Sequence, residues 1–485
     1  MVLIAILHLS VIITLVVTSR RRLENALPYF CFFLVLLPGE AKFIIPGLFD
    51  LSAERVALAT LLVLFLVRGK SNGVKNVPLK NLMLLHAGWA LCSTLYSLSV
   101  ATSFKQLLAQ VLEYYLLYYL FVKIITDVRT IYRIVFAMMM AIGLCCVFAL
   151  LEAYARWSVL SLLPSNLWVT YGFNSTLYIE EGRGLRVHAT FPHPILFGDA
   201  LAMSIPLALY LVSVWKERWR RIMLWIALPL MLWALYKTSS RGPWLALAIS
   251  LVLLFLLVQN KIRKYLVVIA LLSAVIVISR PGIQDTIANL YASTTDADTP
   301  MGSSYEYRHA LMHAITGALN KEPARAILGY GLGTFRQIGL DIDFLGQVER
   351  WQTCDNNWAL FMYETGYVGL VIIGALLFSA LAITIKNYRR LPRPERYFSG
   401  VLFISIFGFC FMILSVAGYS WGQQSYMAWM LIALSVVYGR LAMQKSQKKT
   451  AAPKSLKTPG PAAPREVPTL QALLTGTGEL GGPAN

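Results

Sequence analysis

The sequence predicts an all-α polytopic membrane protein. Of its 485 residues, 57% are hydrophobic and 14% are charged, whereas roughly a quarter of a soluble protein is charged. Apolar runs of about 18 residues or more recur along the chain, and each can cross a bilayer as a helix. The runs are continuous and do not alternate with polar residues, which excludes a transmembrane barrel.

The apolar runs predict about 13 transmembrane helices, with ends uncertain by a few residues. They lie at 2–18, 28–48, 51–67, 81–101, 106–126, 131–153, 194–214, 222–238, 243–259, 265–280, 358–385, 398–418 and 424–443. The first run lacks a basic leading segment and a small-residue cleavage site, so we expect a first span and not a removed signal.

Basic residues gather in every second connection, starting with the first. The clusters are Arg20, Arg21 and Arg22; Arg68, Lys70, Lys75 and Lys80; Lys123, Arg129 and Arg133; Lys216, Arg218, Arg220 and Arg221; Lys261, Arg263 and Lys264; Lys386, Arg389, Arg390, Arg393 and Arg396; and Lys445, Lys448 and Lys449. Because cytoplasmic loops carry the excess of Lys and Arg, we expect the N-terminus outside and the C-terminus in the cytoplasm. The net charge of +19 then needs no nucleic-acid partner.

These spans divide the chain into six parts. They are N-terminal transmembrane helices at 1–153, a first outer loop at 154–193, central transmembrane helices at 194–280, a long outer loop at 281–357, C-terminal transmembrane helices at 358–443 and a tail at 444–485. Loops as long as the two outer ones are uncommon unless they are functional. The tail is rich in Pro, Gly, Ala and Lys, and we expect it to be disordered.

Arginines also stand on the outer side, where the charge bias selects against them. Arg183 and Arg186 lie in the first outer loop, Arg241 begins a span within SSRGP, and Arg308 lies in the second loop. A guanidinium group binds phosphate oxygens with paired hydrogen bonds, so an outer anionic ligand would explain them. The alternative is that they pair with lipid headgroups or with the neighbouring acids Glu180, Glu181 and Glu306.

The second outer loop carries further elements. Residues 304–319 have apolar positions at helical spacing, which predicts an amphipathic helix on or near the membrane. Gly329, Gly331 and Gly333 follow in GYGLG, and such spaced glycines permit a tight backbone path close to a ligand. No strand is predicted before them, so the sequence argues against a nucleotide-binding motif.

The second outer loop ends in polar residues at the entrance to a long span. Asp355, Asn356 and Asn357 come first, and Glu364 follows deeper in the apolar run. Partial burial raises the pKa of a carboxyl group and makes it a better base. Asp and Asn are also favoured helix N-caps, so catalysis and capping both stay open. We group Glu364 with the three glycines as residues that support the backbone of the loop.

A metal site has weaker support. Asp296 with Asp298, and Asp341 with Asp343, form short acidic pairs, while His309 and His313 share a helix face. No third ligand accompanies the histidines, so we predict no metal.

Three stretches resemble the bacterial O-antigen polymerase and ligase superfamily (the Wzy/WaaL type). They are RVHATFPHPILFG, then SSRGPWLAL, and the block from YRHALMHAI through GYGLGTF to DNNWALFMYETGYVGL, together about 183–375. The resemblance implies a GT-C-like membrane glycosyltransferase with a long periplasmic loop. Its donor would be an undecaprenyl-diphosphate-linked glycan at the periplasmic face of the bacterial inner membrane.

By this resemblance, Arg241 and Arg308 would bind the donor diphosphate, with Arg186 as a third contact. Asp355 would be the base on the acceptor hydroxyl, beside Asn356. The family commonly has His-Asn where this sequence has Asp355-Asn356, and this departure favours a polymerase of exopolysaccharide or O-antigen over a ligase. Arginines can neutralise the diphosphate, so no cofactor is expected.

Two other functions stay open. One is a ligase that transfers glycan to lipid A core or to protein. The other is a transporter of polysaccharide or lipid, which would need ionisable residues deep within several spans; Glu113 and Glu364 are the main ones here. Besides the lipid-linked glycan and membrane lipids, chain-length regulators and flippases remain open as partners.

Overall fold

The computed structural model describes residues 1–45, 49–68, 74, 76–168, 176–180, 184–258, 262–264, 266–267, 300–344 and 346–451. The chain divides into two units, Met1–Met443 and Gln444–Asn485, and the architecture below is that of the first unit. Its described residues are mainly helical and form three small antiparallel hairpins. The predicted all-α polytopic class is confirmed at this level.

The helices follow the apolar runs of the sequence. They are α1 (Val2–Thr18), α2 (Leu27–Leu36), α3 (Ala53–Arg68), α4 (Lys80–Leu95), α5 (Val100–Gln110), α6 (Leu116–Ile124), α7 (Val128–Leu150), α8 (Ser165–Trp168), α9 (Pro194–Val214), α10 (Arg218–Lys237), α11 (Arg241–Leu257), α14 (Pro300–Leu319), α15 (Pro323–Leu328), α16 (Thr334–Ile338), α17 (Asn357–Arg390), α18 (Glu395–Met412) and α19 (Gln423–Ala451). Short 3-10 turns cover Leu23–Ala26 and Val159–Leu162, and π-helical turns cover Val111–Tyr115 and Leu151–Ala155.

The hairpins are short and connect helices. They are β1 (Lys42–Phe43) with β2 (Leu51–Ser52), β3 (Tyr178–Glu180) with β4 (Gly184–Arg186), and β5 (Leu340–Phe344) with β6 (Gln347–Trp351). In the longest hairpin, Asp341 pairs with Arg350 and Ile342 with Glu349.

Six of the described segments are long and apolar enough to cross a membrane. They are Val100–Ile124, Val128–Ala155, Pro194–Val214, Asn357–Arg390, Glu395–Met412 and Gln423–Gln447. Val2–Thr18, Leu23–Leu36 and Arg241–Leu257 are shorter apolar helices. The predicted span at 265–280 lies almost entirely outside the described residues, and the predicted count of about 13 transmembrane helices is not confirmed.

The predicted span at 28–48 is wrong in length. The helix α2 ends at Leu36, because Pro38 and Gly39 interrupt it and Glu40 and the strand β1 follow. With 10 residues, α2 has only about half the length that a bilayer requires, and its preceding 3-10 turn of 4 residues still leaves the segment short. Similarly, α18 ends at Met412 and not at the predicted 418.

The helix α17 is broken at Gly366, where φ is 69° and ψ is −178°. A Cβ on Gly374 would lie 3.7 Å from the Trp358 ring. In a straight helix these positions would be roughly 24 Å apart, so the arm at 357–365 folds back along the arm at 367–390. Only the second arm can therefore act as a span, and Glu364 lies at the break rather than deep in the bundle.

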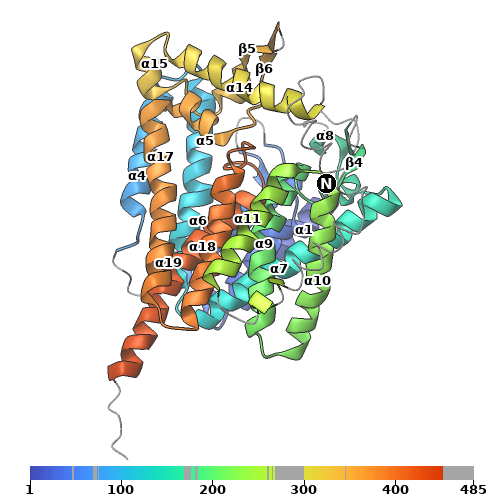
Figure 1. Cartoon of the computed structure of the whole chain (residues 1–485), viewed down its shortest axis with the longest axis vertical. Helices are drawn as coiled ribbons and strands as arrows, with labels where there is room; N and C mark the ends of the chain where they lie inside the picture. Colours follow the sequence, from blue (N-terminus) through green and yellow to red (C-terminus); the bar gives the residue numbers. More distant parts are fainter. Residues whose placement is uncertain are drawn as a thin grey trace, which may run out of the picture. The chain divides into compact units, whose positions relative to one another are not determined.

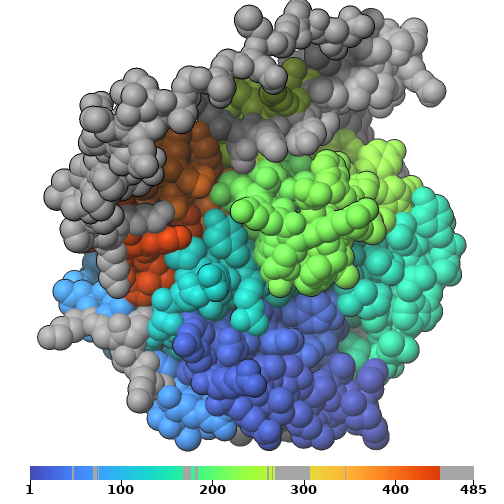
Figure 2. All heavy atoms as spheres, turned by 90° about the horizontal axis from the view of Figure 1, so that it is seen from below, coloured from blue at the N-terminus to red at the C-terminus, as the bar shows by residue number. Residues whose placement is uncertain are grey.

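The basic connections gather at one end of the helices. The hydrogen bonds that join them are Arg68 to Ser19 (2.9 Å), Arg133 to Asn25 (3.3 Å), Arg440 to the Ile125 carbonyl (3.3 Å) and Tyr388 to the Leu257 carbonyl (2.9 Å). Figure 2 views this end and shows the α6–α7 region beside the N-terminal helices and α9–α11. The charge pattern of the sequence thus corresponds to one physical face.

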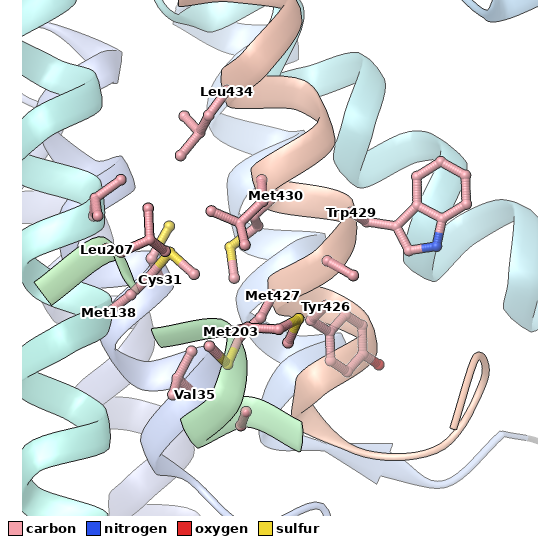
Figure 3. Close-up of a cluster of buried hydrophobic side chains, with 14 of the residues drawn as sticks. Cys31, Val35, Met138, Met203, Leu207, Tyr426, Met427, Trp429, Met430 and Leu434 are labelled. Atoms are coloured by element: carbon pink, nitrogen blue, oxygen red, sulfur yellow. The ribbon is translucent and has the colours of Figure 1, made fainter. Parts of the chain in front are cut away.

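The core is built from α2, α7, α9 and α19, whose side chains interlock (Figure 3). Met138, Met203, Met427 and Met430 are fully buried there, whereas the indole of Trp429 points away from them and packs against Tyr114, Tyr115 and Tyr118. Flexible thioether side chains fill irregular gaps between helices that cross at different angles. This core fixes the positions of the helix ends that carry the polar residues described below.

At the other end lie α14, α15 and the β5–β6 hairpin (Figure 1). The predicted helix at 304–319 is present as α14. Its apolar face, with Leu311, Ile315 and Leu319 fully buried, packs against α17 and β5. The apolar face is therefore buried against protein and does not face lipid.

Candidate active site

The α18–α19 loop, residues 413–422, is the point at which the outer elements meet. The Asn357 amide donates to the Ile413 carbonyl at 2.8 Å, and the Asn357 Oδ1 accepts from the Tyr419 amide at 2.8 Å. Asn357 is the first residue of α17 and is buried. This side chain therefore fixes the start of α17 to the loop.

Arg308 and Asp355 lie together beside this loop. The Arg308 Nη2 donates to the Ser415 carbonyl at 3.3 Å. Burial raises the pKa of the Asp355 carboxyl, while the positive charge of Arg308 partly opposes this rise. The structure thus brings a predicted phosphate ligand next to the predicted base, although they are far apart in sequence.

Arg241 begins α11 next to the same loop. A Cβ on Gly242 would stand 2.9 Å from the Ser415 Oγ, so the first turn of α11 abuts Ser415. The first turn of α9 is adjacent, because a Cβ on Gly198 would stand 2.7 Å from the Pro243 ring. Helix N-termini carry partial positive charge and attract anions. Two parallel N-termini and two arginines therefore make this region electropositive.

Arg186 is buried behind the site, with 2% of its side chain exposed. Its Nε donates to the Thr238 carbonyl at 2.9 Å, its Nη2 donates to the Ser240 Oγ at 2.8 Å, and its Nη1 forms an ion pair with Glu180. All three nitrogens thus bond within the protein. The side chain holds the turn from α10 to α11 immediately before Arg241.

Asn356 and Asp355 have different local roles. The Asn356 Oδ1 accepts from the amides of Trp358 at 2.9 Å and Ala359 at 3.3 Å, so Asn356 is the N-cap of α17. This bonding satisfies amides that a helix start leaves open. Asn356 therefore caps α17, whereas the carboxyl group of Asp355 lies within the influence of the positive charge of Arg308.

The glycine loop at 329–333 is attached to the break in α17. The Glu364 Oε1 accepts from the Gly333 amide at 2.8 Å, and the Glu364 carbonyl accepts from the Gly331 amide at 2.9 Å. A Cβ on Gly329 would stand 2.5 Å from the backbone of Glu364, and Gly329 has φ 74°. The four residues grouped from the sequence are therefore in direct contact.

The described residues contain no group of three or more His, Cys, Asp or Glu side chains that could hold a metal. Asp341 instead pairs with Arg350 through bonds of 2.7 and 2.8 Å, which lower the pKa of Asp341. The rings of His309 and His313 lie 4.7 Å apart. Asp296 and Asp298 lie outside the described residues.

Sequence reasoning missed the α18–α19 loop. Its first residues, 413–418, were assigned to the span at 398–418 because Ile413, Leu414 and Val416 are apolar. The signal that could have located it is the polar and glycine content of AGYSWGQQ. At the end of this stretch, Gln424 donates to the Gly418 carbonyl within the loop, and Gln423 donates to the Thr190 and Leu37 carbonyls outside it.

Together these features define a multi-pass helical membrane protein with an electropositive polar site where several helices begin. Residues 226–374 match the family model described as O-Antigen ligase. This match confirms the resemblance to the Wzy/WaaL-type superfamily for that part of the chain, and it indicates a membrane enzyme of the O-antigen ligase and polymerase type. The matched stretch contains Arg241, Arg308, Asp355 and the glycine loop, and it excludes Arg186. No curated protein matches the chain.

Proposed function

We propose that this protein joins glycan repeat units carried on undecaprenyl diphosphate, as a polymerase of exopolysaccharide or O-antigen. The observation that carries the proposal is that Arg308 and the start of α11 meet at Ser415, while Asp355 lies near enough to Arg308 for the charge of the arginine to lower the pKa of its carboxyl. A base beside fixed cations is what transfer from a lipid diphosphate requires.

In the proposed reaction, the hydroxyl oxygen of the acceptor sugar attacks the anomeric carbon of the donor. The bond from that carbon to the diphosphate oxygen breaks, and the diphosphate leaves with the electron pair. Asp355 takes the hydroxyl proton. Arg241 and Arg308 stabilise the charge that builds on the diphosphate, more strongly in a partly dry site than in water. No nucleotide, cofactor or metal is required.

The site would face the periplasm. The basic connections join at the opposite end of the helices, and such connections are cytoplasmic in membrane proteins. The N-terminus would then be periplasmic and the C-terminus cytoplasmic, in the bacterial inner membrane.

The test compares the glycans of cells that lack the protein with cells that carry it or a variant. We expect deletion, Arg241→Ala and Asp355→Ala each to abolish long polymer, while single repeat units are still made and exported. Removing the cations or the base costs transition-state stabilisation, on the order of 100-fold or more in rate. Gel electrophoresis of the surface glycan measures chain length.

Arg389→Ala is the matched control, because Arg389 is an exposed arginine at the basic end, and it should leave the polymer unchanged. Long polymer that stays on its lipid carrier after deletion would instead identify a ligase that delivers glycan to lipid A core or protein. Unchanged glycans in the deletion strain would contradict glycan transfer and favour transport.

A further inference from the structure

A groove lies between α14 and β5, beside the candidate active site. Its volume is 490 Å³, within the range of about 300–1,000 Å³ that small-molecule sites occupy. The lining residues are Glu306, His309, Ala310, His313, Ala314, Asp341, Asp343 and Phe344. Neither the resemblance nor the proposed reaction assigns a role to this groove.

The lining combines apolar and polar surfaces. Ala310, Ala314 and Phe344 are its apolar members, and the Phe344 ring rests edge-on against Tyr307 with centroids 6.1 Å apart. Carboxylates and imidazoles supply hydrogen-bond acceptors and donors around them. A sugar ring has the same division, with C–H groups on its faces and hydroxyls at its edges.

The charge of the groove opposes that of the diphosphate site. Glu306 and Asp343 give it anionic character, whereas Arg350 pairs with Asp341. Carboxylates accept hydrogen bonds from hydroxyls and repel phosphate. The groove therefore suits the neutral, hydroxyl-rich part of a lipid-linked glycan, and the arginines suit its diphosphate.

The groove and the site share one turn of α14. Arg308, which bonds Ser415, directly precedes His309 in the groove. The Tyr307 hydroxyl donates to the Thr353 carbonyl at 2.8 Å, two residues before Asp355. The groove therefore begins within one helical turn of the arginine that lies beside the candidate base.

We propose that the α14–β5 groove binds the sugar chain of the glycan substrate and holds it during successive transfers. This inference rests on the proposed function, because it names the place where that substrate extends. The groove would determine how long the glycan stays bound, and so the length of the polymer.

The test uses the full-length protein in lipid nanodiscs and a probe without a lipid. The probe is the repeat-unit oligosaccharide, released from the carrier of the same cells by mild acid hydrolysis and followed by calorimetry. We expect the double variant Glu306→Gln and Asp343→Asn to bind it about two- to tenfold more weakly, because each exchange weakens hydrogen bonds to hydroxyls. In cells, the polymer of this variant should be shorter than that of the parent protein.

Glu349→Gln is the matched control, since Glu349 is exposed on β6 and pairs in register with Ile342 and not with a groove carboxylate. Arg241→Ala should bind the free oligosaccharide as the parent does. Equal affinity of the double variant and the parent would overturn the inference while leaving the proposed function intact. Normal polymer from Arg241→Ala would count against the proposed function itself.

Discussion

Two opposing effects act on the pKa of Asp355. Burial raises the pKa of its carboxyl group, and the nearby charge of Arg308 limits that rise. Replacing Arg308 with a neutral residue would remove its lowering effect on the pKa of Asp355. Burial and the charge of Arg308 together set the pH range in which Asp355 is a carboxylate.

This balance predicts the pH dependence of transfer. The carboxylate is the active form, so the rate should be full above the pKa of Asp355 and fall as the pH drops through it, at a pH above the ordinary value of about 3.9 for Asp. Arg308→Gln should lower the rate and move the midpoint to higher pH. Initial rates across the pH range measure this, and a midpoint that stays fixed or moves lower would contradict the assignment.

Replacing Arg186 should lower the stability of the protein. Arg186→Met would leave the Thr238 carbonyl and Ser240 without this donor and Glu180 without its cation, at a cost of about 2–4 kcal/mol. Thermal unfolding in detergent should show a clearly lower midpoint. Arg350→Met, at an exposed pair, is the control and should change the midpoint little. An unchanged midpoint with lost transfer would make Arg186 a ligand contact instead.

Among the elements, the broken helix α17 has the largest effect on the site. Its first arm carries the N-cap beside Asp355, and its break holds the glycine loop. A Cβ on Gly366 would stand 2.1 Å from the Ile327 carbonyl oxygen, and its dihedral angles belong to a region that essentially only glycine adopts. No other residue fits this position without displacing α15.

Gly366→Ala should therefore destabilise the protein by at least about 1–3 kcal/mol and lower transfer with it. Gly317→Ala in α14 is the matched control, because a Cβ there meets nothing within 4 Å, and it should be neutral or stabilising by up to about 1 kcal/mol. Circular dichroism during heating compares the two. Equal melting of both variants would show that the break does not need glycine.

The helices α9, α14 and α17 show which features of the fold the sequence predicts and which it does not. Apolar runs placed α9 at 194–214 and helical spacing placed α14, because composition and period determine such elements directly. The apolar run at 358–385 does not predict the break in α17, since a single glycine inside a helical pattern is tolerated and does not by itself mark a break. Its fold-back depends on contacts with α15, and such contacts leave no periodic signal.

At the scale of the whole molecule, the charge pattern indicated which connections lie at the same end of the helices. It did not indicate which polar side chains lie close together. The basic clusters were assigned to one side by the rule for cytoplasmic loops, and hydrogen bonds join them at one end. Arg308 and Asp355 could be chosen as candidates from their residue types. That they come together beside the α18–α19 loop depends on how α11, α14, α17 and this loop pack, and one sequence alone does not reveal that packing.

The central claim is that the site transfers glycan from a lipid diphosphate. The most direct measurement incubates the purified protein in lipid with the undecaprenyl-diphosphate-linked repeat unit and follows both products. We expect polymer and one released undecaprenyl diphosphate for each new linkage, without added nucleotide or metal, and neither product from Asp355→Ala. Two results would contradict glycan transfer by this site: fewer released undecaprenyl diphosphate molecules than new linkages, or as much polymer from Asp355→Ala as from the parent protein.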